Sequence, residues 1–210
     1  WINTCLGETY EEQGEGLEAH NLEARQETYE AEAPDGVLVV TCGVDVQGDR
    51  LEAEFVGWGL GEESWSVDFK VLWGDPLQGD VFDDLDDYLE QTFQHQSGAQ
   101  LVISASGFDT GGNEGYTQAA YEYIKGKKGS KLFAVKGVSG WGRPIVSSPS
   151  RKRSGKRQRP VDLFPVGVDE AKLIVSRRLG IDTPGPGYCH FPDSRDPEWF
   201  KQITAEKLVT

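Results

Sequence analysis

The fold is decided by residues 37–46, VLVVTCGVDV, a nearly continuous apolar run that closes on the carboxylate of Asp45. A short run that is rich in β-branched residues is typical of a strand buried in the middle of a sheet. A tight turn separates it from residues 50–58, where apolar and acidic side chains alternate as they do in a half-buried strand. A second turn leads to a third strand at residues 64–73. The sequence therefore predicts a three-stranded antiparallel meander that opens with the Asp45 strand.

The rest of the chain mixes helical and strand patterns. Apolar residues at the i, i+3, i+4 spacing predict a helix over residues 80–94. Further on we expect strands at residues 101–105, 131–135 and 188–191, helices at 116–124, 168–179 and 196–208, and β-like pieces around a basic run at 143–168. The order βββαβαβ, followed by further helices and strands, indicates an α/β fold with one mixed sheet.

The composition excludes several classes of protein. The chain has 210 residues, 37% of them hydrophobic, and a formal net charge of −14, which suits a globular domain with one core. These residues contain neither a long apolar run nor a secretory signal, so no membrane span is expected. Three widely spaced cysteines form neither a disulfide framework nor a CxxC zinc motif and favour a reducing compartment. Since the chain has no Met, we expect it to be part of a longer protein.

The charge is strongly segregated along the chain. Residues 1–124 carry 27 acidic and 3 basic residues, whereas residues 125–178 carry 15 basic and 3 acidic ones. The basic residues are densest at Arg151, Lys152, Arg153, Lys156, Arg157 and Arg159. Such a run is either a solvated loop or a loop that lies along a phosphate backbone, where it adds affinity without sequence specificity.

Two aspartates have matching contexts, because Asp45 and Asp109 each end an apolar strand and precede a turn. If the two strands are neighbours, the carboxylates converge at one edge of the sheet and offer the oxygen ligands that Mg²⁺ prefers. Alternatively, each aspartate only caps its turn. Asp169 lies where a helix N-cap or a metal ligand would lie, and Lys136 ends a short strand as either a phosphate contact or a plain surface lysine.

Several motifs occur in a fixed order along the chain. They are NTCLGE (3–8), GVDVQGDRLE (43–52), GWG (57–59), GEESW (61–65), DTGG (109–112), KG (136–137), GVDEAK (167–172) and HFP (190–192). In this order they resemble the C-terminal half of lambda-type large terminase subunits of tailed bacteriophages, over nearly the whole chain.

The resemblance implies an RNase H-like mixed β-sheet flanked by helices, with a long basic hairpin insertion. Residues 37–210 would be the nuclease domain with an incomplete C-terminal end, and residues 1–36 a linker from an absent N-terminal ATPase domain. The family holds two Mg²⁺ or Mn²⁺ ions, and its first and second metal aspartates fall on Asp45 and Asp109. Its third carboxylate lies on a helix that would follow Thr210, which leaves Asp169 as a substitute within this chain.

The implied function is that of an endonuclease that cuts concatemeric viral double-stranded DNA by two-metal phosphodiester hydrolysis. The implied partners are double-stranded DNA, a small terminase subunit and the portal and procapsid, in the host cytoplasm and transiently on the procapsid, with no membrane. The expected DNA contacts are Lys136 and the six basic residues of 151–159. Two alternatives remain: a DNA-gripping or docking module that is inactive in this form, and a resolvase- or integrase-like nuclease of the same fold.

Overall fold

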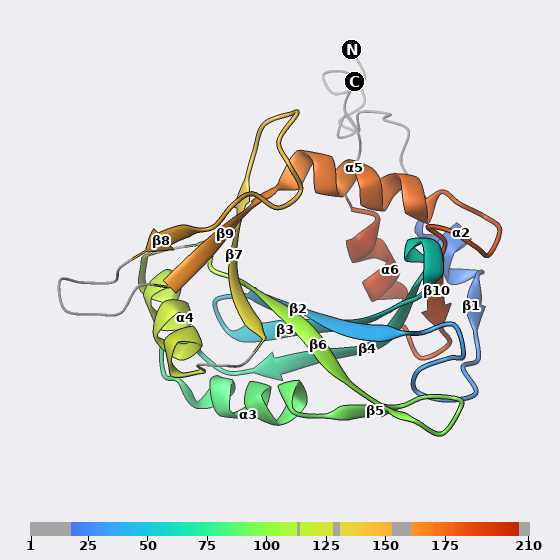
Figure 1. Ribbon diagram of the computed structural model, residues 1–210, viewed down its shortest axis with the longest axis horizontal. Coiled ribbons are helices and arrows are strands. Elements are labelled where there is room, and N and C mark those ends of the chain that lie inside the picture. The colour runs from blue at the N-terminus through green and yellow to red at the C-terminus, as the bar shows by residue number, and fades with distance from the viewer. Residues whose placement is uncertain (1–17, 113, 128–130, 153–160, 206–210) are drawn as a thin grey trace, which may run out of the picture.

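One mixed ten-stranded sheet forms the centre of the computed structural model, which describes residues 18–112, 114–127, 131–152 and 161–205 (Figure 1). Its strands are β1 (Gln26–Glu27), β2 (Val39–Val46), β3 (Arg50–Trp58), β4 (Ser64–Trp73), β5 (Thr92–Gln94), β6 (Gln100–Asp109), β7 (Leu132–Val138), β8 (Ser150–Lys152), β9 (Val161–Gly167) and β10 (Cys189–Pro192). The helices are α2 (Ala19–Glu23), the short 3₁₀ helix η1 (Leu60–Glu62), α3 (Asp80–Leu89), α4 (Glu114–Gly126), α5 (Val168–Leu179) and α6 (Pro197–Ile203). The predicted mixed α/β sheet is confirmed, and this arrangement is compatible with an RNase H-like nuclease fold.

The strand order is β1-β10-β4-β3-β2-β6-β7-β9-β8, with β5 paired to β6. Strands β2, β3 and β4 form the predicted antiparallel meander. Strand β2 also pairs with β6 in parallel, and β6, β7 and β9 continue in the same direction. The carboxyl ends of β2, β6, β7 and β9 therefore meet at one edge of the sheet.

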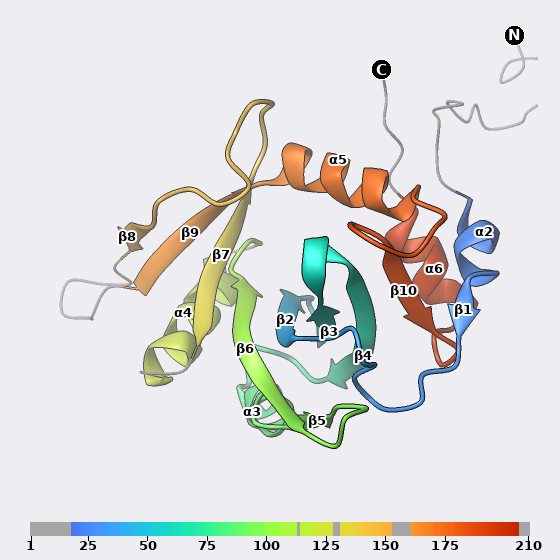
Figure 2. The same cartoon turned by 45° about the vertical axis from the view of Figure 1, so that its right-hand side comes forward.

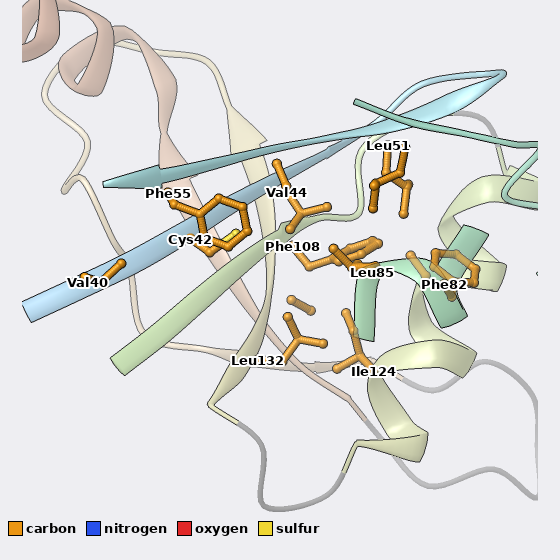
Figure 3. Packing of buried hydrophobic residues seen from close by; sticks show 14 of the residues in the cluster. Val40, Cys42, Val44, Leu51, Phe55, Phe82, Leu85, Phe108, Ile124 and Leu132 are labelled. Atoms are coloured by element: carbon orange, nitrogen blue, oxygen red, sulfur yellow. The ribbon is translucent and has the colours of Figure 1, made fainter. Parts of the chain in front are cut away.

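The two faces of the sheet differ in what covers them. Leu51, Ala53 and Phe55 of β3 are fully buried and point toward the side where α3 and α4 lie, and this packing forms the main core (Figure 3). Helix α5 lies on the other side of the sheet in both views (Figures 1 and 2). Because side chains alternate along a strand, the acidic residues Glu52 and Glu54 face away from the main core.

The predicted helix over residues 80–94 is too long. Helix α3 ends at Leu89, and the last residues of the prediction form β5, which pairs with the start of β6. Phe93 is buried there and its ring lies 5.6 Å from that of Phe55. Pairing with the next strand along the chain thus overrides the helical spacing. Helix α6 begins as expected, after Asp196 caps it by accepting from the Trp199 backbone N–H at 2.8 Å.

Residues 18–36 are packed against the domain, and the linker role that the resemblance implies for residues 1–36 stays a prediction. Strand β1 pairs with β10 in parallel, and Leu22 of α2 is buried in a second cluster with Leu179, Phe191 and Phe200. The guanidinium of Arg25 donates to the carbonyl oxygens of Leu179 and Cys189 at 2.8 and 2.9 Å. The N-terminal part that the structure describes is therefore attached to the far end of the sheet.

The basic segment forms the predicted hairpin in part. Strand β8 pairs antiparallel with β9, while Arg153, Lys156, Arg157 and Arg159 lie outside the described residues. None of the helices in the described ranges has the length and apolarity that crossing a membrane requires.

We expect Arg25→Ala to lower the free energy of unfolding by about 2 kcal/mol, because it removes three hydrogen bonds from a charged donor, to the two carbonyl oxygens and to the Tyr188 hydroxyl. In this variant, amide hydrogen exchange should also become faster in residues 18–27, and this increase should be larger than any increase in β2. Arg177→Ala, at an exposed position in the last turn of α5, is the matched control and should change neither quantity. Equal exchange in the Arg25 variant and the unmodified protein would contradict the proposed attachment.

Candidate active site

Asp45 and Asp109 lie at the carboxyl ends of neighbouring parallel strands. In the β2–β6 pair, Val44 is in register with Phe108, and both side chains are buried in the main core. The next residue on each strand, Asp45 or Asp109, must therefore point to the opposite face. The two strand-end aspartates thus share a face and an edge, which is the arrangement that a shared site requires.

A local hydrogen bond orients each carboxylate. The side-chain amide of Gln47 donates to Asp45 Oδ2, and the backbone N–H of Gly111 donates to Asp109 Oδ1 at 2.8 Å. Asp109 therefore does cap its turn, as one interpretation of the sequence suggested. Capping uses one oxygen of the carboxylate and is compatible with ligation through the other.

A pocket of about 480 Å³ opens on this face of the sheet. Its walls combine four carboxylates with apolar side chains and backbone: Gly43, Val44, Asp45, Glu52, Glu54, Phe69, Gly107, Asp109, Val135, Gly137, Val166 and Val168. Two of the lining glycines, Gly43 and Gly107, are paired across β2 and β6. A methyl group at Gly43 would extend into open space, so the pocket floor beside the aspartates is bare backbone that a ligand can approach closely.

Glu52 and Glu54 are pocket residues that the sequence prediction did not include. The β2–β3 register places Glu52 opposite Asp45 and Glu54 opposite Gly43. The sequence did contain the signal, since a short turn after residue 46 fixes this register and the alternation along 50–58 puts both glutamates on one face. Glu52 accepts from Arg50 Nε at 2.7 Å, so it enters the pocket wall as half of an ion pair.

Glu54 connects the pocket to the C-terminal helix. It accepts from Ser66 Oγ at 2.5 Å and from the indole N–H of Trp199 at 3.2 Å, and the Arg195 guanidinium lies 3.6 Å away. Burial raises the pKa of Glu54 to about 7, although Arg195, Ser66 and Trp199 act in the opposite direction. Helix α6 is thereby fixed to the back of the pocket wall.

Asp169 is not among the residues that line the pocket. It lies in the first turn of α5, where its Oδ2 accepts from the backbone N–H of Gly140 at 2.5 Å. The metal role of Asp169 stays a prediction. Its observed contact is with the loop that follows β7.

Three of the predicted DNA contacts, Lys136, Arg151 and Lys152, fall within the described residues. Lys136 is exposed near the end of β7. It faces the side of the sheet opposite to the pocket residues Val135 and Gly137. Arg151 is exposed on β8, with its Nε 3.6 Å from Asp162. Lys152 ends β8, and the other four basic residues lie outside the described part of the chain.

The donor set of the pocket suits a hard cation that keeps part of its own hydration. Within the described residues, no three His, Cys, Asp or Glu side chains come close enough to hold one metal ion together. Asp45 and Asp109 instead offer two oriented carboxylates beside an open floor. Mg²⁺ is commonly bound by one or two carboxylates, with water and substrate phosphate in its remaining positions.

The raised pKa of Glu54 predicts a pH dependence of stability. A carboxyl group with a pKa of 4.5 when unfolded and about 7 when folded stabilises the fold fully below pH 4.5 and loses that contribution as the pH rises through 7. Glu54→Gln should remove this dependence, which amounts to a few kcal/mol at most. Urea unfolding over that pH range measures it, with Glu198→Gln, an exposed carboxylate of α6, as the control. Parallel curves for the unmodified protein and the Glu54 variant would contradict this assignment.

Comparison with known proteins identifies the family. Residues 1–210 match the family "Terminase large subunit gpA, endonuclease domain". The chain is 36% identical over 219 residues to the large terminase subunit of Escherichia phage lambda and 35% identical over 215 residues to that of Enterobacteria phage P21. These matches cover 100% of this chain but 33% and 32% of the relatives, so it spans about a third of their length, and no solved structure matches it. The predicted resemblance is thus confirmed, and the chain belongs to the family of terminase large subunit endonuclease domains.

Proposed function

We propose that this endonuclease domain hydrolyses phosphodiester bonds of double-stranded DNA in the pocket between Asp45 and Asp109, using two divalent cations, Mg²⁺ or Mn²⁺. The observation that carries the proposal is that two neighbouring parallel strands end in carboxylates that line one pocket. Membership in an endonuclease family implies a dependence on divalent metal ions. The bound ions would neutralise charge on the scissile phosphate and activate the attacking water.

The electrostatics of the pocket support this requirement for metal. Four carboxylates line it, and an approaching DNA phosphate would be repelled by them. Asp45 and Asp109 would hold the cations, and the glycine floor would let the phosphate come close to the backbone. Outside the pocket, Arg50 forms ion pairs with Asp49 and with the pocket residue Glu52, so it offsets part of the acidic charge.

The basic hairpin of β8 and β9 would bind the DNA backbone outside the pocket. The acidic half of the chain supplies the carboxylates of the pocket, and the basic segment 125–178 supplies a positive region along β7, β8 and β9. Contacts of this kind orient a duplex but do not read its sequence. Lys136, Arg151 and Lys152, together with Arg153, Lys156, Arg157 and Arg159, are the proposed phosphate contacts.

The wider role follows from the relatives, which are large terminase subunits. We propose that the domain cuts concatemeric viral DNA during genome packaging, in the host cytoplasm and transiently at the procapsid portal. A small terminase subunit would select the site, and an ATPase in the remaining two thirds of a protein like these relatives would move the DNA.

Asp45→Asn and Asp109→Asn should each lower the cleavage of supercoiled plasmid in Mn²⁺ by about 100-fold or more, because each removes a carboxylate that would hold the cations at the reacting phosphate. Isothermal titration with Mn²⁺ should show a parallel loss of metal affinity. Asp49→Asn is the matched control, since this aspartate lies in the same hairpin and is exposed outside the pocket. Full cleavage by the Asp45 variant would refute the proposed site, and duplex binding without cleavage in either metal would favour a DNA-gripping module.

Changing Arg151, Lys152, Arg153, Lys156, Arg157 and Arg159 to Gln should weaken duplex binding and make it less sensitive to salt. Each lost phosphate contact lowers the slope of log affinity against log salt by about 0.9. Binding is measured by fluorescence anisotropy with the metal removed, so that cleavage does not interfere. An unchanged slope would show that this segment is only a solvated loop.

A further inference from the structure

Residues 139–149 connect β7 to β8 and form a loop that carries an exposed tryptophan; we name it the tryptophan loop. The side chain of Trp141 is 67% exposed, and Ile145 and Val146 of the same loop are 44% and 59% exposed. The loop leaves the carboxyl end of β7, the edge of the sheet at which β2 and β6 end in Asp45 and Asp109. It projects beyond the sheet beside the start of α5 (Figures 1 and 2).

The backbone on both sides of Trp141 is fixed by the first turn of α5. The N–H of Gly140 donates to Asp169 Oδ2 at 2.5 Å, and the N–H of Gly142 donates to Glu170 Oε1 at 2.8 Å. Both glycines have positive φ angles, 123° and 73°, which other residues rarely adopt. The exposed indole is therefore presented from a defined backbone.

The other side of the tryptophan loop is attached to the wall of the pocket. The N–H of Ser147 donates to the Pro165 carbonyl at 2.9 Å, and the N–H of Gly167 donates to the Ile145 carbonyl at 3.1 Å. Val146 forms an antiparallel bridge with Val166, which lines the pocket. The loop is thus fixed to the pocket wall while Trp141 stays outside the pocket.

The charge around the loop indicates which partner meets the indole. The segment 125–178 has 15 basic and 3 acidic residues, and two of those acids, Asp169 and Glu170, are engaged by the loop backbone. Arg143 is exposed within the loop, and Arg151 follows it on β8. A rigidly presented aromatic ring inside a basic surface suits a polyanion whose bases can stack on it or be wedged apart.

We propose that Trp141 contacts the bases of the duplex next to the scissile phosphate, and that Asp169 and Glu170 are positioning residues that hold the tryptophan loop for this contact. The proposal rests on the proposed function in one respect, namely that duplex DNA is the substrate. This contact adds to the phosphate contacts of the domain. It fixes the position of the duplex, along the duplex axis, relative to the pocket.

The test separates an aromatic contact from an ionic one. We expect Trp141→Ala to weaken the binding of a fluorescein-labelled duplex in EDTA by about 10-fold, within the range for one base stacked on an aromatic ring. The salt dependence of binding should stay unchanged, because no phosphate contact is lost. The change in intrinsic tryptophan fluorescence on duplex binding should also shrink in Trp141→Phe. Leu60→Ala is the control and should bind like the unmodified protein. Leu60 is 81% exposed and lies between β3 and β4, at the end of β2 that is opposite to Asp45.

A double-mutant cycle tests the positioning residues. If Asp169 acts through the loop, Asp169→Ala weakens duplex binding in the unmodified background but adds little in the Trp141→Ala background. If Asp169 were instead a metal ligand, its variant would abolish cleavage in Mn²⁺ and leave duplex affinity in EDTA unchanged, which overturns this part of the proposal.

Unchanged duplex affinity in Trp141→Ala would overturn the base contact and leave the loop as a surface for a protein partner. This outcome is distinct from failure of the nuclease proposal, because plasmid cleavage and its loss in Asp45→Asn are measured separately. Failure of the unmodified protein to bind any duplex would refute both proposals.

Discussion

The site depends on the parallel pairing of β2 with β6. This pairing places Val44 next to Phe108 in the main core and so turns Asp45 and Asp109 together to the opposite face. A slip of one residue in either strand would bury a carboxylate in the core and remove a core side chain, which is costly in both respects. The same hydrophobic packing that fixes the sheet therefore fixes the geometry of the acidic pair.

The domain separates two electrostatic tasks that oppose each other. A pocket lined by four carboxylates can concentrate cations, but it repels the DNA that it has to cut. The sequence places the attractive charge in a separate stretch, residues 125–178, and the topology brings that stretch to the strands beside the pocket. Affinity for the backbone and affinity for metal thus come from neighbouring but distinct parts of one sheet.

Much of the fold was predictable because its strands have strong local signals. Residues 50–58 and 64–73 form strands with the predicted bounds, since alternation and turn residues agree with the tertiary pairing. The error at residues 90–94 arose because Phe93 fits a helical spacing equally well, and only pairing with β6 makes it a strand. The packing of residues 18–36 was equally hidden, because contacts such as those of Arg25 join residues more than 150 positions apart.

The site was predictable only where side-chain direction followed from the strand pattern. Two aspartates at the ends of apolar strands must point away from the core, and the register of a short hairpin extends that inference to Glu52 and Glu54. Asp169 offers no such constraint, because a residue in the first turn of a helix can face a metal site, cap its own helix or hold a neighbouring loop. Here the loop provides two glycine N–H groups at the start of α5, and the carboxylates of Asp169 and Glu170 accept from them. The contacts of Asp169 were therefore decided by the conformation of residues 139–149, a loop whose path the sequence pattern does not define.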